Sequence, residues 1–358
     1  MNTLRNVINI KSAATLPSLK KILNKTNCSL QLQEFITTQR QEITNILSGG
    51  DTRLLVIMGP CSIHDPVAAI EYAHRLAEEQ KRYQSSLKLV MRTYFEKPRT
   101  RGGWKGFIVD PDLNGDFNLH KGINQSRKLM QSILELGVPT AHEFLDPNIA
   151  HYIADLVCWG AIGARTTESQ PHRQLASGLL CPIGFKNGTD GNIDISIDAI
   201  HTAQDCHSVI AQTSDNQTIA IKTRGNNNCH VILRGGTTPN YSTQHIKQTS
   251  FQLTRSKLPL KLVVDCSHGN SEKIAKNQLV VVKDIANQIS LGETNIAGVM
   301  CESFLVGGNQ TIDADLLTYG QSITDECLSW QDSLLFLEHL NNAVLQHKSS
   351  HLTKTEHS

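Results

Sequence analysis

The sequence lacks several features that define large classes of proteins. No stretch approaches the roughly 20 consecutive apolar residues of a membrane-spanning helix, and the first residues lack the apolar segment of a signal peptide. The nine cysteines are odd in number, scattered and without a CxxC pair, which argues against a disulfide framework or a zinc finger. We therefore expect a cytoplasmic protein without a membrane partner.

The chain also lacks a charge imbalance. Its 34 Lys and Arg residues face 33 Asp and Glu residues, for a net charge of +1. No field from the whole molecule would attract nucleic acid or anionic lipid, so we expect no nucleic-acid partner and any cationic site must be local. At 358 residues, of which 39% are hydrophobic, the chain is long enough for one large α/β barrel or two smaller domains.

What the sequence contains is an alternation of short apolar runs with segments of helical periodicity from residue 53 onward. Continuous apolar strands between helices are typical of a parallel sheet covered by helices. Eight such units favour an α/β fold of the closed (β/α)8 TIM-barrel type over an open doubly wound sheet. The absence of GxGxxG after the first run also weakens the open-sheet alternative.

The domain boundaries follow from breaks in this alternation. Residues 1–48 predict an N-terminal extension with a short strand at 6–10, a helix opened by Pro17 and an amphipathic helix ended by Gly49. The catalytic barrel is expected over residues 49–347, and a frayed polar tail over 348–358. Two β-rich runs around a polar turn predict a β-hairpin inserted at about 207–223, before the sixth barrel strand.

Each of the eight apolar runs ends on a side chain that can bind a metal or an anion. In chain order these are Cys61, Arg92, Glu143, Arg165, Lys186, Arg234, His268 and Glu302. The carboxyl ends of barrel strands form one face, where the loops of such enzymes build their active sites. The pattern therefore predicts a functional site at that face.

Four of these positions suggest a metal site. Cys61, His268 and Glu302 end three of the runs, and Asp325 follows the last one. Sulfur, nitrogen and oxygen ligands together suit one borderline divalent ion such as Mn²⁺, Fe²⁺, Co²⁺ or Zn²⁺, and are too soft a set for Mg²⁺ or Ca²⁺. Taken alone, Cys61 would more often be a buried structural thiol than a ligand.

A second group of side chains suggests an anion site. Residues 92–105 contain five cations together with Pro98, which restricts the backbone, and two glycines. That loop alone could be a solvated basic segment or an RNA-binding patch. Arg165, Lys186 and Arg234 arrive from three other strand ends, which favours a cradle for two small phosphorylated acids.

The motifs around these residues resemble one family. GPCSIHDP, YFEKPRT, GARTTESQ, GFKNGTDG, ILRGG, DCSHGNS, the glutamate-containing segment ESFLVGGNQ and SITD are similar to the motifs of type I 3-deoxy-D-arabino-heptulosonate 7-phosphate (DAHP) synthases. The resemblance runs from about residue 4 to about residue 344. It implies a metal-dependent (β/α)8 barrel that condenses phosphoenolpyruvate with erythrose 4-phosphate and water, giving DAHP and phosphate in the first step of the shikimate pathway.

The resemblance also implies residue roles. The metal ligands would be Cys61, His268, Glu302 and Asp325. The contacts to phosphoenolpyruvate would be Arg92, Lys97, Arg165, Lys186, Arg234 and the backbone N–H of Ala164. The erythrose 4-phosphate site would comprise Lys97, Pro98, Arg99 and Thr100.

Two further roles follow from the chemistry of this reaction. The aldehyde must become more electrophilic, which a metal at Cys61 and His268 would achieve, and Lys97 could share or donate a proton to its oxygen. Glu143 could orient or deprotonate the attacking water, or it could be an ion-pair partner of Lys186 or Lys97. Asp65 is expected to cap the first barrel helix, and His64, His172 and Asp265 are expected to support the site.

Three alternatives remain at this point. They are the related 3-deoxy-octulosonate 8-phosphate synthase, a Schiff-base aldolase using Lys186, and a non-catalytic aromatic-amino-acid sensor. The N-terminal arm, the KPRT segment and the hairpin favour the heptulosonate enzyme over the first of them.

Regulation is where the sequence departs from the family pattern. The resemblance implies an aromatic effector between barrel and hairpin, yet its serine, aromatic and second serine positions hold Leu180, Val209 and Ala211, and its acidic N-terminal pair is Asn2–Thr3. We therefore expect weak or no inhibition by phenylalanine and tyrosine. The arm and hairpin further suggest a homodimer or homotetramer.

Overall fold

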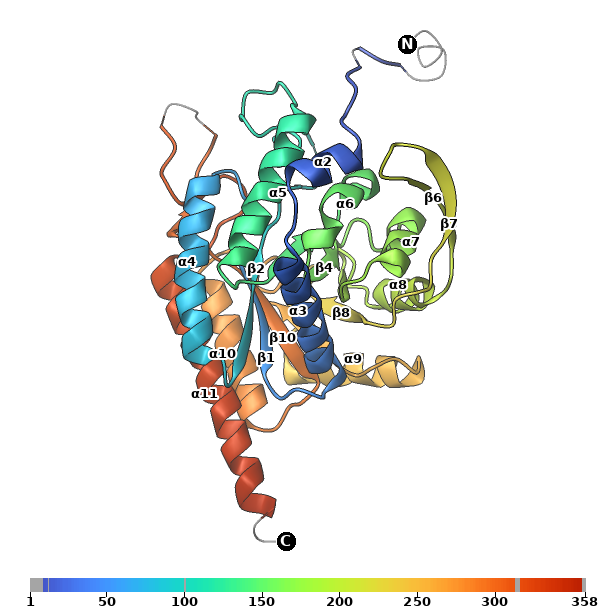
Figure 1. The fold of residues 1–358 in the computed structure, drawn as a ribbon. Helices are drawn as coiled ribbons and strands as arrows, with labels where there is room; N and C mark the ends of the chain where they lie inside the picture. The colour runs from blue at the N-terminus through green and yellow to red at the C-terminus, as the bar shows by residue number, and fades with distance from the viewer. Residues whose placement is uncertain (1–8, 12, 100, 313–315, 356–358) are drawn as a thin grey trace.

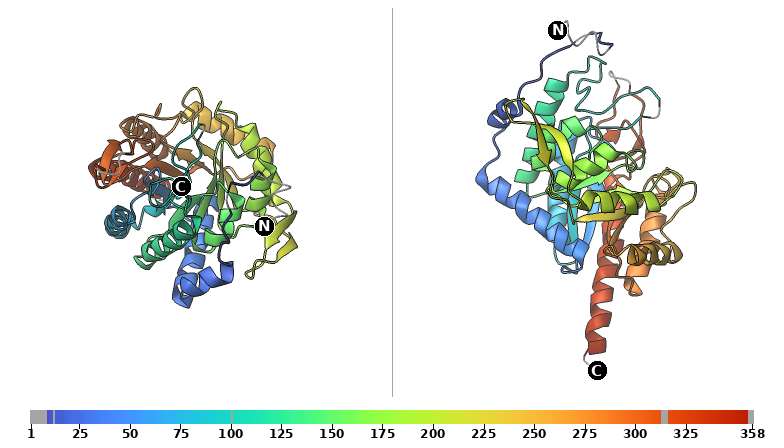
Figure 2. Two further views of the ribbon diagram at one scale, coloured as in Figure 1. Left: turned by 90° about the horizontal axis from the view of Figure 1, so that it is seen from above. Right: turned by 90° about the vertical axis from the view of Figure 1, so that its right-hand side faces the viewer.

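The computed structural model describes residues 9–11, 13–99, 101–312 and 316–355, with only the backbone of 351–355. Eight parallel strands close into a barrel with helices around it, as the end-on view shows (Figure 1; Figure 2, left). Around the barrel, each strand neighbours the next in the order β1, β2, β3, β4, β5, β8, β9, β10 and back to β1. The predicted (β/α)8 barrel is thus confirmed.

The barrel strands coincide with the eight apolar runs. They are β1 (Leu54–Gly59), β2 (Leu87–Arg92), β3 (Thr140–Glu143), β4 (Trp159–Ile162), β5 (Ile183–Lys186), β8 (Cys229–Leu233), β9 (Leu262–Asp265) and β10 (Ile296–Glu302). Every residue of these strands is buried, which explains why they read as continuous apolar runs. In the register of β1 with β10, Gly59 lies opposite Glu302, so Cys61 emerges beside that carboxylate.

Helices pack on the outside of the strands. They are α4 (Pro66–Tyr83), α5 (Leu119–Glu135), α6 (Pro147–Ile153) with the 3₁₀ turn η1 (Ala154–Leu156), α7 (Gln170–Gly178), α8 (Asp194–Gln204), α9 (Thr243–Arg255), α10 (Asn277–Ser290) and α11 (Trp330–Thr355). As predicted, Asp65 caps α4: its carboxylate accepts the N–H of Val67 at 2.8 Å. A small two-stranded sheet, β11 (Val306–Asn309) with β12 (Gln321–Ser322), follows β10.

The N-terminal extension contains α2 (Leu19–Lys25) and α3 (Leu30–Ser48). The first helix begins two residues after Pro17 because the Ser18 hydroxyl accepts the N–H of Lys21 at 3.3 Å. The strand expected at residues 6–10 falls mostly outside the described residues, and Asn9–Ile10 are not in a strand.

The inserted hairpin consists of the antiparallel strands β6 (Ser208–Gln212) and β7 (Thr218–Lys222), at the outside of the barrel (Figure 2, right). It contacts the N-terminal extension: the N–H of Lys20 donates to the carbonyl of Ser214 at 2.9 Å, and the ammonium of Lys20 lies 3.4 Å from Asp215. The two additions to the barrel therefore touch each other.

Two local features differ from the sequence-based expectation. Helix α7 was not predicted, because Pro171 and Gly178 bracket only nine residues of weak apolar periodicity. The backbone of α11 stays helical through Thr355 instead of fraying after residue 347, and no glycine or proline interrupts it there. No helix within the described residues is long and apolar enough to cross a membrane.

Candidate active site

A cavity of about 580 Å³ opens at the carboxyl face of the barrel. It is lined by twelve of the residues singled out in the sequence: Arg92, Lys97, Pro98, Arg99, Glu143, Ala164, Arg165, Lys186, Arg234, His268, Glu302 and Asp325. Cys61 lies fully buried next to this cavity. Thr100 lies outside the described residues.

Three of the four expected metal ligands converge closely. Ligand atoms of Cys61, Glu302 and Asp325 all lie within 4.8 Å of one another. The Lys97 ammonium lies among them, 2.6 Å from the Cys61 sulfur and 3.0 Å from a carboxylate oxygen of Asp325. The ammonium of Lys97 thus contacts two of the three members of this cluster.

The protonation states of the cluster depend on burial and on neighbouring charges. Burial, reinforced by Glu302, raises the pKa of the Cys61 thiol to about 12, so the free thiol is neutral at physiological pH. Burial also opposes ionisation of Asp325, but Lys97 outweighs it and holds the pKa of that carboxyl well below its usual range. A metal bound to Cys61 would have to displace the thiol proton.

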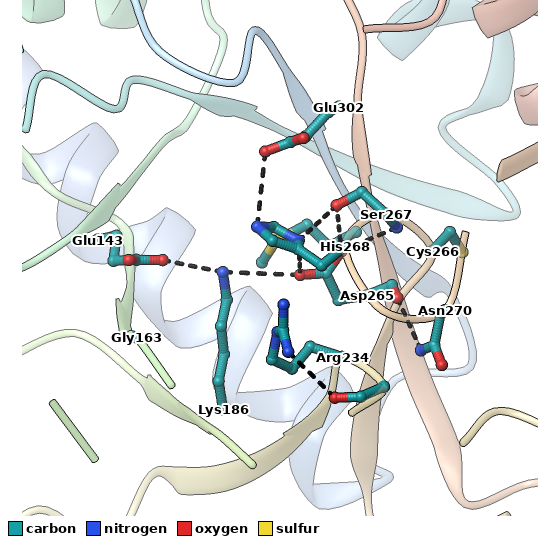
Figure 3. A network of polar contacts seen from close by, with 12 residues as sticks. Glu143, Gly163, Lys186, Arg234, Asp265, Cys266, Ser267, His268, Asn270 and Glu302 are labelled. Atoms are coloured by element: carbon teal, nitrogen blue, oxygen red, sulfur yellow. Dashed lines mark hydrogen bonds and ion pairs between the residues drawn. The ribbon is translucent and has the colours of Figure 1, made fainter. Parts of the chain in front are cut away.

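His268 is not part of this close cluster, and its ring lies between Glu302 and Asp265 (Figure 3). Its Nε2 lies 3.8 Å from Glu302, while its Nδ1 lies 2.9 Å from the buried carboxylate of Asp265. The backbone of His268 is left-handed, with φ of 55°, which is uncommon for a residue other than glycine and turns the ring toward the cavity. Asp265 thus orients the imidazole, a supporting role of the kind expected for it.

The cationic side of the cavity is built around buried Arg92. Its guanidinium lies 3.9 Å from the ring centre of Tyr94 and donates to Glu302 at 3.1 Å. Gly59, with φ of 148°, makes room for this strand end, since a Cβ there would lie 3.1 Å from the backbone of Arg92. Arg165 and Arg234 line the same cavity from the ends of β4 and β8.

Lys186 and Glu143 form a buried ion pair opposite His268 (Figure 3). Their charged atoms are 2.9 Å apart, and Asp265 lies 3.6 Å from the same ammonium. Burial alone would raise the pKa of Glu143, but Lys186 lowers it to about 2. So weak a base favours the second of the two roles left open for Glu143, that of an ion-pair partner. Gly163 permits the pair, because a Cβ there would lie 2.5 Å from Glu143 Oε1.

Sequence reasoning missed several residues of the site. Glu96 is buried and accepts the N–H groups of Leu145 and Asp146 at 3.3 and 3.0 Å, and His142 lies 3.2 Å from it. This network ties the segment before Lys97 to the end of β3. Other residues without an assigned role also line the cavity: Tyr94, Arg101, Gly102, Thr189, Gly236, Gly269 and Lys273. Their positions in loops after strand ends were the available signal.

The remaining predicted positions lie farther away. His172 is held by Ser169 and the carbonyl of Leu145, both at 2.7 Å, and does not line the cavity. Leu180 is 80% exposed before β5, and Val209 and Ala211 lie on β6. Asn2–Thr3 fall outside the described residues.

Comparison with known proteins gives one consistent result. Residues 28–338 match the DAHP synthetase I family. The Trp-sensitive phospho-2-dehydro-3-deoxyheptonate aldolase of Escherichia coli K12 is 54% identical over 86% of this chain and 89% of its own length. The Phe-sensitive enzyme of the same strain is 47% identical over 96% of this chain and 99% of its own. The solved structure of phospho-2-dehydro-3-deoxyheptonate aldolase from Francisella tularensis SCHU S4 matches with a TM-score of 0.93 and 45% identity, over 95% of this chain and 99% of that one.

Proposed function

Because the chain belongs to the DAHP synthetase I family and is a DAHP synthase, we propose that the cavity at its carboxyl face performs a metal-dependent condensation of phosphoenolpyruvate with erythrose 4-phosphate. The observation that carries this proposal is the junction of a Cys–Glu–Asp cluster with a ring of cations in one cavity. Such a site can hold an ion and two phosphorylated substrates side by side.

The cations bind and orient the substrates in this proposal. Arg92, Arg165, Lys186 and Arg234, with the Ala164 N–H, hold the phosphate and carboxylate of phosphoenolpyruvate. Lys97, Pro98, Arg99 and Thr100 hold erythrose 4-phosphate. Bringing two anions that repel in solution into reacting distance lowers the barrier by several kcal/mol.

The residues present fit one divalent ion of the Mn²⁺, Fe²⁺, Co²⁺ or Zn²⁺ type. Cys61, Glu302 and Asp325 supply sulfur and oxygen donors, and His268 Nε2 faces Glu302 from the cavity side. When bound, the ion supplies Lewis-acid polarisation of the aldehyde. Lys97 is placed to donate a proton to the aldehyde oxygen as it develops negative charge. The Lys186–Glu143 pair is placed to orient the water that adds at C2 of phosphoenolpyruvate. Phosphate then leaves by cleavage of the C–O bond.

A coupled assay tests this function. Phosphate release should require both sugar phosphate and phosphoenolpyruvate, and DAHP should form in equal amount. Arabinose 5-phosphate should replace erythrose 4-phosphate poorly, and borohydride should trap no adduct on Lys186. Equal use of arabinose 5-phosphate would instead support an octulosonate 8-phosphate synthase, and a trapped adduct a Schiff-base aldolase.

For regulation, the proposal is weak or absent inhibition by phenylalanine and tyrosine. It rests on the apolar Leu180, Val209 and Ala211 at positions where the family pattern has polar or aromatic groups for an amino-acid effector. Relatives carry the names Trp-sensitive and Phe-sensitive, so all three aromatic amino acids should be titrated against turnover. Submillimolar inhibition by phenylalanine or tyrosine would refute this part.

Assembly as a homodimer or homotetramer is proposed from the exposed apolar hairpin. Ile210 on β6 is 81% exposed and Leu180 beside α7 is 80% exposed, and burial of both against a second copy would remove apolar surface from water. Light scattering should give a mass above the 39.6 kDa of one chain, and the substitution Ile210→Lys should lower that mass.

For localisation, we propose the cytoplasm, because the nine free cysteines suit its reducing conditions.

A further inference from the structure

A second cavity lies at the opposite end of the barrel from the active site. Its volume is about 700 Å³, within the range of small-molecule sites. It is lined by Leu54 at the start of β1, Ile296 at the start of β10 and Lys261 just before β9, so it opens at the amino ends of the strands. The last turns of α11 leave the barrel from this end (Figure 1). None of the described residues lines both cavities.

One part of the wall of this amino-end cavity is apolar. Five large aliphatic side chains line it, each at most 5% exposed: Ile46, Leu54, Ile289, Ile296 and Val344. They come from α3, β1, α10, β10 and α11, which places the cavity where five elements meet. An apolar body could displace water from these walls favourably.

The rim of the cavity carries an excess of positive charge. Of its two carboxylates, Asp51 pairs with Arg53 at 2.6 Å, whereas Glu293 accepts the N–H of Asn295 at 2.8 Å and keeps its charge, which partly compensates that of Lys261. Lys261 and Lys348 instead donate to the backbone carbonyls of Thr294 and Ser85. Neither of these two ammonium groups has a carboxylate within ion-pair distance among the described residues.

The surroundings of Lys261 disfavour its positive charge. It is half-buried, and burial lowers its pKa, with only partial compensation from Glu293. Its stem passes Gly49, where the left-handed backbone (φ 84°) ends α3 and a Cβ would lie 3.3 Å from the Lys261 Cε. An anion beside this ammonium would offset the unfavourable burial of its charge.

We propose that the amino-end cavity is a binding site for a small amphipathic monoanion, a carboxylate with an aliphatic or aryl-alkyl body. The apolar body lies against Ile46, Ile289 and Ile296, and the carboxylate faces Lys261 and Lys348. A dianionic sugar phosphate is a poorer ligand here, because the five aliphatic side chains of the wall offer its hydroxyl groups no hydrogen-bond partners. This site is separate from the cavity that holds the substrates of the proposed condensation.

Octanoate is a suitable probe, with octanamide and octylamine as neutral and cationic counterparts of equal length. In the full-length protein with labelled isoleucine methyl groups, octanoate should shift the resonances of Ile46, Ile289 and Ile296 saturably at concentrations up to about 10 mM. The mid-barrel Ile232 should not shift. Octanamide should bind about tenfold more weakly, and octylamine should not bind.

Lys261→Met keeps the aliphatic stem and removes the charge, so it should weaken octanoate binding about tenfold and leave octanamide binding unchanged. Lys348→Met provides a second charge-removing variant if the first folds poorly. Lys283→Met, an exposed change on α10 away from the cavity, is the matched control and should bind octanoate like the parent. The proposal is overturned if no saturable shift occurs, if other isoleucines respond instead, if octanamide binds equally well, or if both lysine variants keep full affinity.

Discussion

At the scale of single residues, the buried charges of the site depend on one another. Glu143 and Lys186 are both almost fully buried and 2.9 Å apart, and removal of Glu143 leaves the Lys186 ammonium with the more distant Asp265, at 3.6 Å, as its remaining carboxylate. Glu143→Gln should therefore lower the free energy of unfolding by about 3 kcal/mol in urea titrations. Glu78→Gln breaks an exposed pair with Lys81 and should change it by less than about 0.5 kcal/mol, which makes it the matched control.

The same pair predicts a pH dependence. Because the folded-state pKa of Glu143, about 2, lies below the ordinary 4.5, its stabilisation is fully present above the ordinary value and is lost as pH falls toward 2. The stability gap between the parent and Glu143→Gln should be constant between about pH 6 and pH 8 and narrow below about pH 4.5. A gap that widens on acidification would contradict the ion pair.

We predict that Glu96 affects catalysis by positioning the segment that carries Lys97. It touches no cavity cation but holds two backbone N–H groups at the end of β3 while standing next to Lys97. Glu96→Ala should lower kcat/KM about tenfold, mainly through KM for erythrose 4-phosphate, with Glu96→Gln restoring part of the loss. Equal losses for both substrates and no rescue would indicate a purely structural role.

At the scale of elements, the barrel strands could be predicted from the sequence more completely than the helices. Strands such as β1 and β10 are buried on both faces, so their apolar runs need no context to be recognised. Helix α7 was missed because its nine residues include Pro171, His172 and Gly178, and its stability comes from tertiary contacts. The amino-end cavity could not be predicted from the sequence either, because its walls come from five segments that are far apart in the chain.

The long C-terminal helix allows a test at this scale. Val344 is buried and Lys348 donates to Ser85, whereas Ser349 and Ser350 are exposed. Truncation after Lys348 should leave turnover unchanged and shift Tm by no more than about 2 °C. Truncation after Leu340 removes Val344 and should destabilise the protein by more than about 2 kcal/mol. Equal effects of the two truncations would contradict the packing of α11.

At the scale of the whole molecule, the two ends of the barrel differ in chemistry. The carboxyl face joins a cluster of side chains that could hold a metal ion to a ring of cations, and the amino end has a partly apolar cavity with a cationic rim. The strand-end residues were predictable because each directly follows an apolar run. What the sequence could not predict is their spacing: Cys61, Glu302 and Asp325 are 241 and 23 residues apart in sequence order, yet their ligand atoms meet within 4.8 Å.

We propose that the Cys61–Glu302–Asp325 cluster holds a catalytic divalent ion, and removal of the metal is the decisive test. Phosphate release from phosphoenolpyruvate in the presence of erythrose 4-phosphate should be measured after chelation and again after addition of Mn²⁺ or Co²⁺. We predict a loss of more than about 100-fold on chelation, full recovery on reconstitution, and no recovery in Asp325→Asn or Cys61→Ala. Full turnover of the chelated, metal-free parent would show that no bound ion is needed for catalysis.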